Sequence, residues 1–439
     1  MKFLPTRTAF RALLVVAALP VAMLGLLSLP WTAERAPGRP RVVSMARATG
    51  PLAAGAAEVS FALPPEVPIA GFARLSYASA PPPEPTGVRA VVLAAPGCRV
   101  ALVSAELLLV PDALAADVAA RVSDLGLDGL VLAATHTHAG PGGFWDNAVF
   151  ERFGTGPFDP KIRDAIASAT AEAIRRAAAT LAPARLSVAR GAADELARSR
   201  SGGDEDAPLT VVRLERADGA PLAEVTVFAA HPTLLGKRNR TISGDWPGRF
   251  LADGRHGMRL FLQGAIGDQS AEGPASAAPE RFAAAVAAHV DALTYPPPDP
   301  APLLAFAAVE VGLPSLDAGG APALLRPAAR TMTTSAKTLP ATARVEAIRI
   351  GPALLLAVPA EPVARVGARW RSALPDGAVI VSLADGYLGY VEAPERMAER
   401  AGETVRTYYG PALAETLGAA VRAAASATAA STATATPAR

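Results

Sequence analysis

The amino-acid sequence predicts an α/β fold, with mixed sheets covered by helices in a single large domain. Helical and strand patterns alternate along the chain, whereas a segregated architecture would group them. Two hairpin signals, at Asp218-Gly219 and Gly351-Pro352, indicate antiparallel pairs and exclude a purely parallel sheet. The chain has 439 residues, of which 51% are hydrophobic, so it can bury a large core.

The amino terminus has the pattern of an export segment. Three basic residues precede Ala12 to Leu29, a stretch without charge that is long enough to enter a membrane. The first Ala-x-Ala lies well downstream, at Ala46 to Ala48, which favours an uncleaved signal anchor over a cleaved signal peptide. We therefore expect residues 1–30 to place the rest of the chain on the periplasmic or extracellular side, attached to the membrane through residues 12–29.

Composition divides the remainder into three parts. Residues 31–56 are rich in Pro and Arg and are expected to form a linker. Residues 57–423 are expected to form the catalytic domain, and residues 424–439, rich in Ala, Ser and Thr, a disordered tail.

The secondary structure of the body follows from hydrophobic periodicity. Apolar runs bounded by turn residues predict strands, and apolar residues at helical spacing predict helices. The predicted strands are 58–63, 88–94, 99–103, 129–134, 184–191, 210–214, 223–228, 259–263, 345–350, 353–358 and 378–383. The predicted helices are 111–125, 159–181 and 279–293, with a further one that continues through Trp370.

Charge and cysteine content exclude several classes of function. The 42 Lys and Arg residues nearly balance 40 Asp and Glu residues, and the net charge of +2 gives no electrostatic reason to expect a nucleic-acid partner. The single cysteine, Cys98, can form no internal disulfide. It lies in a turn between two predicted strands, and we interpret it as a residue without a catalytic role.

Two histidines follow the apolar run 129–134 and precede a glycine-rich turn. Alternate residues of a strand point to the same face, so His136 and His138 are expected to leave the sheet together. A His-x-His pair alone is weak evidence, because such pairs are often ordinary polar surface residues. Four other apolar runs also end in a polar residue, namely His231, Ser270, Glu361 and Tyr390. Two imidazoles and a carboxylate are usual ligands of a catalytic zinc ion, whereas a phenol is a less common one.

These motifs, in this order, resemble those of the neutral/alkaline (non-lysosomal) ceramidases, a family of zinc-dependent amidases. Residues 134–143 (ATHTHAGPGG) are similar to the first zinc-ligand motif of the family, and residues 228–233 (FAAHPT) with 242–245 (ISGD) to the second. Residues 263–270 (QGAIGDQS) resemble the segment of the nucleophilic serine. Residues 359–361 match the site of the carboxylate ligand, and residues 386–395 match that of the tyrosine ligand. Residues 409–411 match a closing motif. The resemblance extends from about Val59 to Leu417.

The resemblance implies a set of site residues. A Zn²⁺ ion would be bound by His136, His231, Glu361 and Tyr390, with Ser270 as the catalytic serine and His138 beside the metal; Gly71 and Arg198 would contact the substrate. The implied reaction is hydrolysis of the N-acyl amide of ceramide, or of a related N-acyl lipid, to a fatty acid and an amine.

The nucleophile of this reaction stays open at this point. Ser270 could attack the amide carbonyl and form an acyl-enzyme, or it could orient the amide while a zinc-bound water attacks. His138 is the expected proton donor to the developing oxyanion or to the leaving amine.

Three departures from the family pattern concern the substrate and the domain organisation. Gly402 replaces a tyrosine expected at the substrate, Ala271 replaces the proline that follows the serine, and a carboxy-terminal immunoglobulin-like domain is expected to be missing. The loss of the tyrosine favours one alternative, a non-catalytic membrane-tethered relative that binds a lipid or glycan. Against it, all four implied ligands and Ser270 are retained, and a binding protein has no need of a serine beside a metal.

Overall fold

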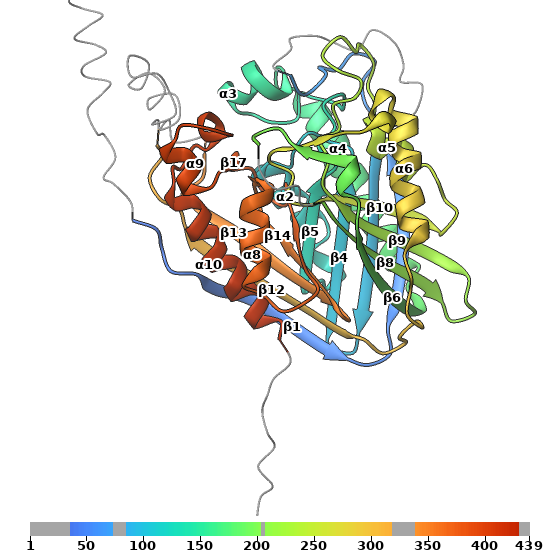
Figure 1. Ribbon diagram of the computed structural model, residues 1–439. Coiled ribbons are helices and arrows are strands. Elements are labelled where there is room, and N and C mark those ends of the chain that lie inside the picture. The colour runs from blue at the N-terminus through green and yellow to red at the C-terminus, as the bar shows by residue number, and fades with distance from the viewer. Residues whose placement is uncertain (1–35, 73–84, 203–206, 318–338, 430–439) are drawn as a thin grey trace, which may run out of the picture.

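The computed structural model describes residues 36–72, 85–202, 207–317 and 339–429. Two β-sheets pack face to face, and helices cover their outer faces (Figure 1), which confirms the predicted α/β fold with mixed sheets in one domain. No helix within the described ranges is long and apolar enough to cross a membrane. The predicted export segment, residues 12–29, lies outside these ranges.

The larger sheet has eight strands in the order β10-β9-β8-β6-β2-β3-β4-β5. Its neighbours are antiparallel except for the pairs β4–β5 and β9–β10, which are parallel and lie at opposite edges. The strands are β2 (Ala53–Ser60), β3 (Gly87–Ala95), β4 (Cys98–Ala105), β5 (Gly129–Ala134), β6 (Ala182–Ala192), β8 (Pro208–Arg216), β9 (Pro221–Phe228) and β10 (Met258–Gln263).

The smaller sheet has five strands in the order β1-β12-β13-β14-β16, of which only the pair β14–β16 is parallel. These strands are β1 (Arg41–Thr49), β12 (Leu303–Gly312), β13 (Thr342–Ile350), β14 (Ala353–Ala357) and β16 (Ala378–Val381). Two short pairs lie beside the sheets: β7 (Ala197–Ser199) with β11 (Gln269–Ala271), and β15 (Glu361–Pro362) with β17 (Tyr390–Val391).

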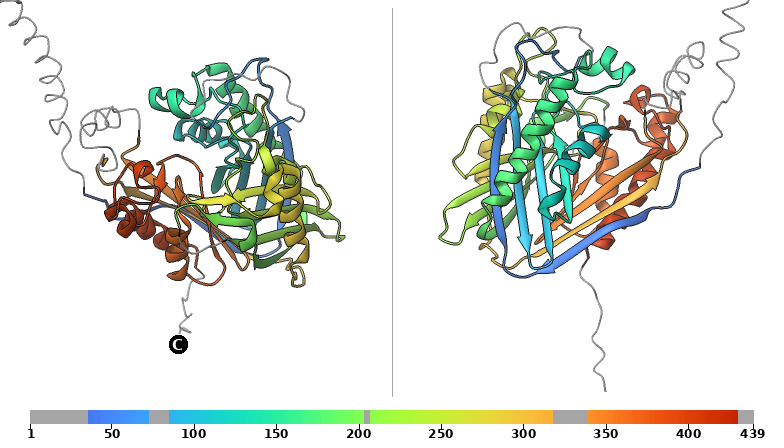
Figure 2. Two further views of the ribbon diagram at one scale, coloured as in Figure 1. Left: turned by 45° about the horizontal axis from the view of Figure 1, so that its top comes forward. Right: turned by 180° about the vertical axis from the view of Figure 1, so that it is seen from behind.

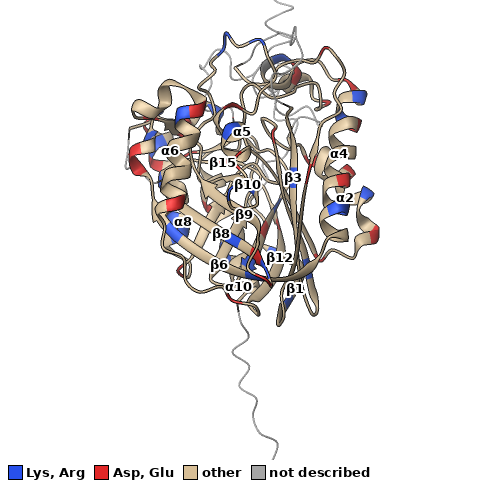
Figure 3. Ribbon diagram, turned by 90° about the vertical axis from the view of Figure 1, so that its right-hand side faces the viewer, with Lys and Arg blue, Asp and Glu red and all other residues tan. Residues whose placement is uncertain are grey.

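Apolar side chains from both sheets interleave to form one core layer, which contains Leu102, Val225, Phe306 and Leu355. Helices pack on the outer faces: α4 (Pro160–Ala179) lies over β2 and β3 (Figure 2, right), and α10 (Ala412–Ala427) lies over the smaller sheet. The other helices are α2 (Asp112–Arg121), α3 (Ala148–Phe150), α5 (Asp245–Leu251), α6 (Pro279–Ala292), α8 (Ala364–Ser372) and α9 (Pro394–Ala398). Acidic and basic residues are interspersed along the outer helices (Figure 3). One ion pair between helices joins Arg121 on α2 to Asp164 on α4.

The larger sheet curls so that its two edge regions approach each other. Ser104 on β4 donates a hydrogen bond to the Phe261 carbonyl on β10 over 2.5 Å, although these strands are far apart in the strand order. Gln263, the last residue of β10, donates to the carbonyl of Thr135, just past β5, over 2.8 Å. The polar residues that follow β5, β9 and β10 are thereby brought to one end of the sandwich.

The structure corrects the predicted boundaries of the body. The predicted linker, residues 31–56, contains β1 and the first half of β2, so the expectation of an unstructured segment is wrong over its described part. The predicted tail is helical at its start, because α10 continues to Ala427. Helix α10 is rich in alanine, but its Leu413, Leu417 and Val421 lie on a face that is buried against the smaller sheet. This packing stabilises the helix despite its low-complexity sequence.

Candidate metal centre

His136 lies in a sharp turn immediately after β5. Its φ of 67° is in the left-handed region, which ends the strand and redirects the chain. Its Nδ1 lies 2.7 Å from the Leu108 carbonyl oxygen, and because a carbonyl can only accept, Nδ1 carries the proton and Nε2 presents a lone pair. The rings of His136 and His138 meet edge to face, with centroids 4.8 Å apart. The two histidines are together as expected, but the turn and not strand alternation brings them together.

His231 follows β9 and is held in the same way. Its Nδ1 donates to the Gln269 carbonyl oxygen over 2.9 Å, which again directs the Nε2 lone pair away from the backbone. A parallel β-bridge joins His231 to Ser270, so the segments after β9 and β10 run side by side. The ring centroid of His231 is 4.8 Å from that of His136.

Glu361 and Tyr390 come from segments that follow two strands of the smaller sheet. They are direct partners in the short parallel pair of β15 and β17, which continue the chain beyond β14 and β16. Tyr387 donates to Glu361 Oε1 over 2.7 Å. This bond leaves Glu361 Oε2 facing the imidazoles, 3.3 Å from His136 Nε2 and 3.5 Å from His231 Nε2.

Lone pairs therefore converge in a buried space. His138 Nε2 is 3.2 Å from His136 Nε2, and the Tyr390 hydroxyl is 3.4 Å from His231 Nε2. The three imidazoles offer nitrogen atoms that all lie within 4.8 Å of one another. The structure brings together the four ligands that the resemblance implied and adds His138 as a further group that could bind a metal ion.

This donor set fits a small tetrahedral cation. Metal bonds of about 2.0–2.1 Å at tetrahedral angles place neighbouring donor atoms about 3.3 Å apart. The observed separations of 3.3 Å, 3.5 Å and 3.4 Å among His136, Glu361, His231 and Tyr390 agree with this value. Glu361 Oε2 is buried and accepts no hydrogen bond from any described residue. A bound cation would satisfy this buried oxygen.

The electrostatics favour the protonation states that metal binding requires. Burial lowers the pKa of His231 to about 4, with a further contribution from the charge of Arg200. Burial alone would raise the pKa of Glu361, but the neighbouring imidazoles of His136 and His231 lower it well below its usual range. A neutral imidazole beside an ionised carboxylate is the state in which both groups can bind a cation.

The structure also locates the catalytic and substrate-binding residues implied by the resemblance. Ser270 on β11 is partly exposed and lies beside His231 through the β-bridge. Gly71 has a φ of +87°, and a Cβ atom at this position would lie 2.8 Å from atoms of His138, so only glycine fits against that ring. Arg198 is the cross-strand partner of Ser270, but its side chain is well exposed and pairs with Glu272 at 2.9 Å.

Three residues that support the site were not singled out by sequence. Gln263 is fully buried and bonds to Thr135 and Ala230, the residues near the two histidine loops. Arg200 donates to the Tyr390 hydroxyl over 3.1 Å. Gln263 and Tyr387 both lie within the motifs quoted above. Gln263 contacts Thr135, 128 residues away, and Tyr387 contacts Glu361, 26 residues away, so only the folded structure shows their roles.

The replacement of Tyr387 by phenylalanine is expected to weaken metal binding by about tenfold to a hundredfold, the usual effect of losing a group that orients a ligand. The change removes only the hydroxyl that fixes Glu361 Oε1. Metal affinity measured by competition with a chelator tests this expectation. Tyr409→Phe is the matched control, because Tyr409 is equally buried and donates to the Pro340 carbonyl, over 2.6 Å. Equal affinities in the two variants would contradict the orienting role.

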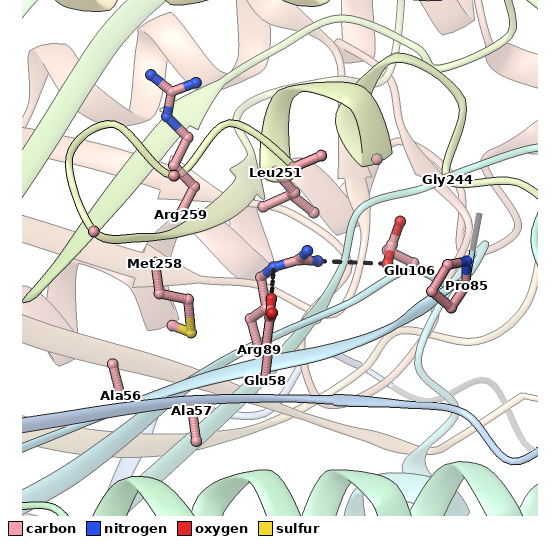
Figure 4. Close-up of a pocket in the computed structure, with 14 residues that line it drawn as sticks. Ala56, Ala57, Glu58, Pro85, Arg89, Glu106, Gly244, Leu251, Met258 and Arg259 are labelled. Carbon is pink, nitrogen blue, oxygen red and sulfur yellow. Dashed lines mark hydrogen bonds and ion pairs between the residues drawn. The ribbon is translucent and has the colours of Figure 1, made fainter.

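A cavity between β2, β3 and the segment around α5 does not contain the metal centre. It has a volume of about 580 Å³, and Arg89 points into it between Glu58 and Glu106 (Figure 4). The guanidinium lies 3.1 Å from Glu58 and 3.5 Å from Glu106, so it forms an ion pair with each carboxylate. No imidazole lines this cavity. Cys98 is buried, and burial raises the pKa of its thiol to about 12, which agrees with its interpretation as non-catalytic.

The fold and the converging ligands define a candidate metalloenzyme, and comparison with known proteins narrows its class. Residues 63–251 match the family model described as neutral/alkaline non-lysosomal ceramidase, N-terminal. This range contains His136, His138 and His231 but ends before Ser270. This match confirms, over these residues, the resemblance to the neutral/alkaline ceramidases found in the motifs.

Individual relatives agree with this result. The chain is 32% identical to a neutral ceramidase of Mycobacterium tuberculosis over 167 residues, which cover 34% of this chain and 26% of the relative. It is 30% identical to a neutral ceramidase of Pseudomonas aeruginosa over 200 residues, which cover 41% and 30% of the two chains. The matched parts thus span less than a third of these relatives.

The solved structure of neutral ceramidase from Pseudomonas aeruginosa superimposes with a TM-score of 0.71 at 21% identity, covering 86% of this chain and 74% of that one. A structure described as ceramidase complexed with C2 gives a TM-score of 0.70 at 22% identity, covering 86% and 75%. At this level of identity the superpositions establish a shared fold.

Proposed function

We propose that this protein is a zinc-dependent amidase that hydrolyses the N-acyl amide bond of ceramide or of a related N-acyl lipid. The observation that carries the proposal is the convergence of His136, His231, Glu361 and Tyr390 at tetrahedral spacing next to a serine. The ceramidase names of its relatives supply the substrate class.

In this proposal His136, His231, Glu361 and Tyr390 hold the zinc ion. A bound zinc ion supplies Lewis acidity, which polarises a carbonyl group or lowers the pKa of a water to about 7. The protein positions its own groups around that chemistry. The Leu108 and Gln269 carbonyls fix the two imidazoles, and Tyr387 fixes the carboxylate.

Ser270 and His138 are the proposed catalytic side chains. The Ser270 hydroxyl acts on the amide carbonyl, either by attack or by a hydrogen bond that orients it. In the overall reaction a C–O bond forms at the carbonyl carbon, the C–N bond breaks, and the leaving amine takes a proton. His138, which lies 3.2 Å from His136, moves this proton.

A non-catalytic lipid or glycan binder is the competing function. It gains support from Gly402, where the resemblance implies a tyrosine. The retention of every ligand and of Ser270 in one cluster favours catalysis, because a binding role requires no serine beside a metal ligand.

The test is metal analysis of the purified protein together with hydrolysis of a fluorescent N-acyl lipid, with and without a chelator. We expect about one zinc ion per chain and hydrolysis that the chelator abolishes and added zinc restores. A protein that binds the lipid, contains no metal and releases no fatty acid would be the binder.

Export is a separate proposal. It depends on the sequence of residues 1–30 alone and is tested by fractionation of cells that produce the full chain.

A further inference from the structure

Arg200 lies next to the proposed ligands, directly after β7, with donors to spare. Its Nε donates to Glu403 over 2.8 Å, and its Nη2 donates to the Gly267 carbonyl over 2.8 Å and to the Tyr390 hydroxyl over 3.1 Å. These bonds leave the Nη1 amino group outside them, and 30% of the side chain is exposed. An arginine held by one side of its fork presents the other side to a ligand.

Two arginines share one carboxylate beside Tyr390. Arg200 and Arg406 bind opposite oxygens of the same carboxylate, that of Glu403, which is buried. Both guanidinium groups also lie over the Tyr390 ring, at 5.7 Å and 5.5 Å from its centroid. Arg200 and Arg406 therefore share the single carboxylate of Glu403 beside Tyr390, in a partly desolvated place where charge is felt strongly.

Residue 402 is a glycine and adds no polar side chain next to Glu403. Gly402 has a φ of +61°, and a Cβ atom there would lie 2.1 Å from Glu392 Oε2 and 3.5 Å from the Ser201 hydroxyl. The place where the resemblance implies a substrate-facing tyrosine therefore offers the substrate no side chain. Arg200 has an unused donor group in this part of the site and also contacts the Tyr390 hydroxyl.

We infer that Arg200 recognises a carboxylate on the amine portion of the substrate, so that the protein prefers N-acyl amino acids to N-acyl lipids with a neutral head. This inference rests on the proposed amidase function and narrows its substrate. In an N-acyl amino acid the carboxylate is separated from the amide nitrogen by one carbon atom. The Nη1 group of Arg200 remains to donate to such a carboxylate, and a hydrogen bond between a guanidinium and a carboxylate is stronger than one between neutral groups.

Two amides with the same acyl chain test the inference. N-Lauroylglycine carries a carboxylate where N-lauroylethanolamine carries a hydroxymethyl group. With the zinc-loaded full chain, we expect kcat/KM to favour the glycine conjugate by about tenfold or more, the scale of one charged hydrogen bond. Arg200→Gln should abolish this preference, mainly through KM for the glycine conjugate. Glu403→Gln removes the neutralising charge and should increase the preference.

Controls separate recognition from support of the fold. Arg369→Gln removes an exposed arginine from an ordinary ion pair with Glu395 and should leave the preference unchanged. If Arg200→Gln slows both substrates equally, Arg200 only supports Tyr390 and the inference is overturned. Equal kcat/KM values in the wild type overturn it as well, while the amidase function stands.

Binding to the Ser270→Ala variant, measured by calorimetry, is independent of turnover. Tighter binding of N-lauroylglycine than of N-lauroylethanolamine, lost when Arg200→Gln is added, supports carboxylate recognition. If the two amides bind in this way but the wild type hydrolyses neither, the proposed amidase function fails and carboxylate recognition stands. Equal binding of the two amides overturns the inference.

Discussion

His231→Ala is expected to remove both the bound metal and amide hydrolysis. His231 contributes a buried Nε2 lone pair that lies 3.5 Å from Glu361 Oε2 and 3.4 Å from the Tyr390 hydroxyl. Without His231, three donors from distant segments must hold the ion. Metal affinity should then fall by more than about a hundredfold, a larger loss than the removal of a residue that only orients a ligand would cause. Metal content after dialysis and turnover of a fluorescent N-acyl lipid are the two measurements.

The matched control for this variant is His289→Ala. His289 lies on α6, where its Nε2 is 2.6 Å from Glu195 Oε1, and it takes no part in the cluster. It should keep the metal and full activity. A His231→Ala protein that retains stoichiometric metal and normal turnover would show that the converging residues are not the active centre.

Ser270→Ala is expected to separate chemistry from metal binding. Ser270 lies beside His231 but is not among the groups that face Glu361 Oε2, so its loss should leave metal affinity unchanged. Turnover should fall by about a hundredfold or more, the scale of one lost catalytic group. Single-turnover rates with saturating lipid, together with zinc content, measure the two effects.

Ser276→Ala controls for the loss of a partly buried hydroxyl, because Ser276 donates to the Gly273 carbonyl away from the cluster. Full turnover in Ser270→Ala, with turnover abolished in His231→Ala, would assign the attack on the amide to water and leave the serine without a catalytic role. If both variants remain active, the assignment of the site to this family fails.

The sequence by itself determined the elements that end at the site. The apolar run 129–134 coincides with β5, and 259–263 differs from β10 by one residue, because buried strands have continuous hydrophobic runs that stop at polar or glycine residues. The motifs around His136 and His231 also indicated a resemblance to the ceramidases, which the family model confirmed over residues 63–251. These are properties of short segments, and short segments can be read from sequence.

Only the tertiary structure decided how these segments meet. His136 follows an edge strand and His231 follows a strand near the opposite edge, and they touch because the larger sheet curls and Gln263 bonds across the gap. Arg200 and Tyr387 acquire their roles from contacts with residues far away in the sequence. The sequence of β1 resembled a linker because it contains arginine and its residues are largely exposed. It forms a strand because it pairs with β12. Strand pairing and sheet curvature depend on burial shared between distant residues, which no local pattern encodes.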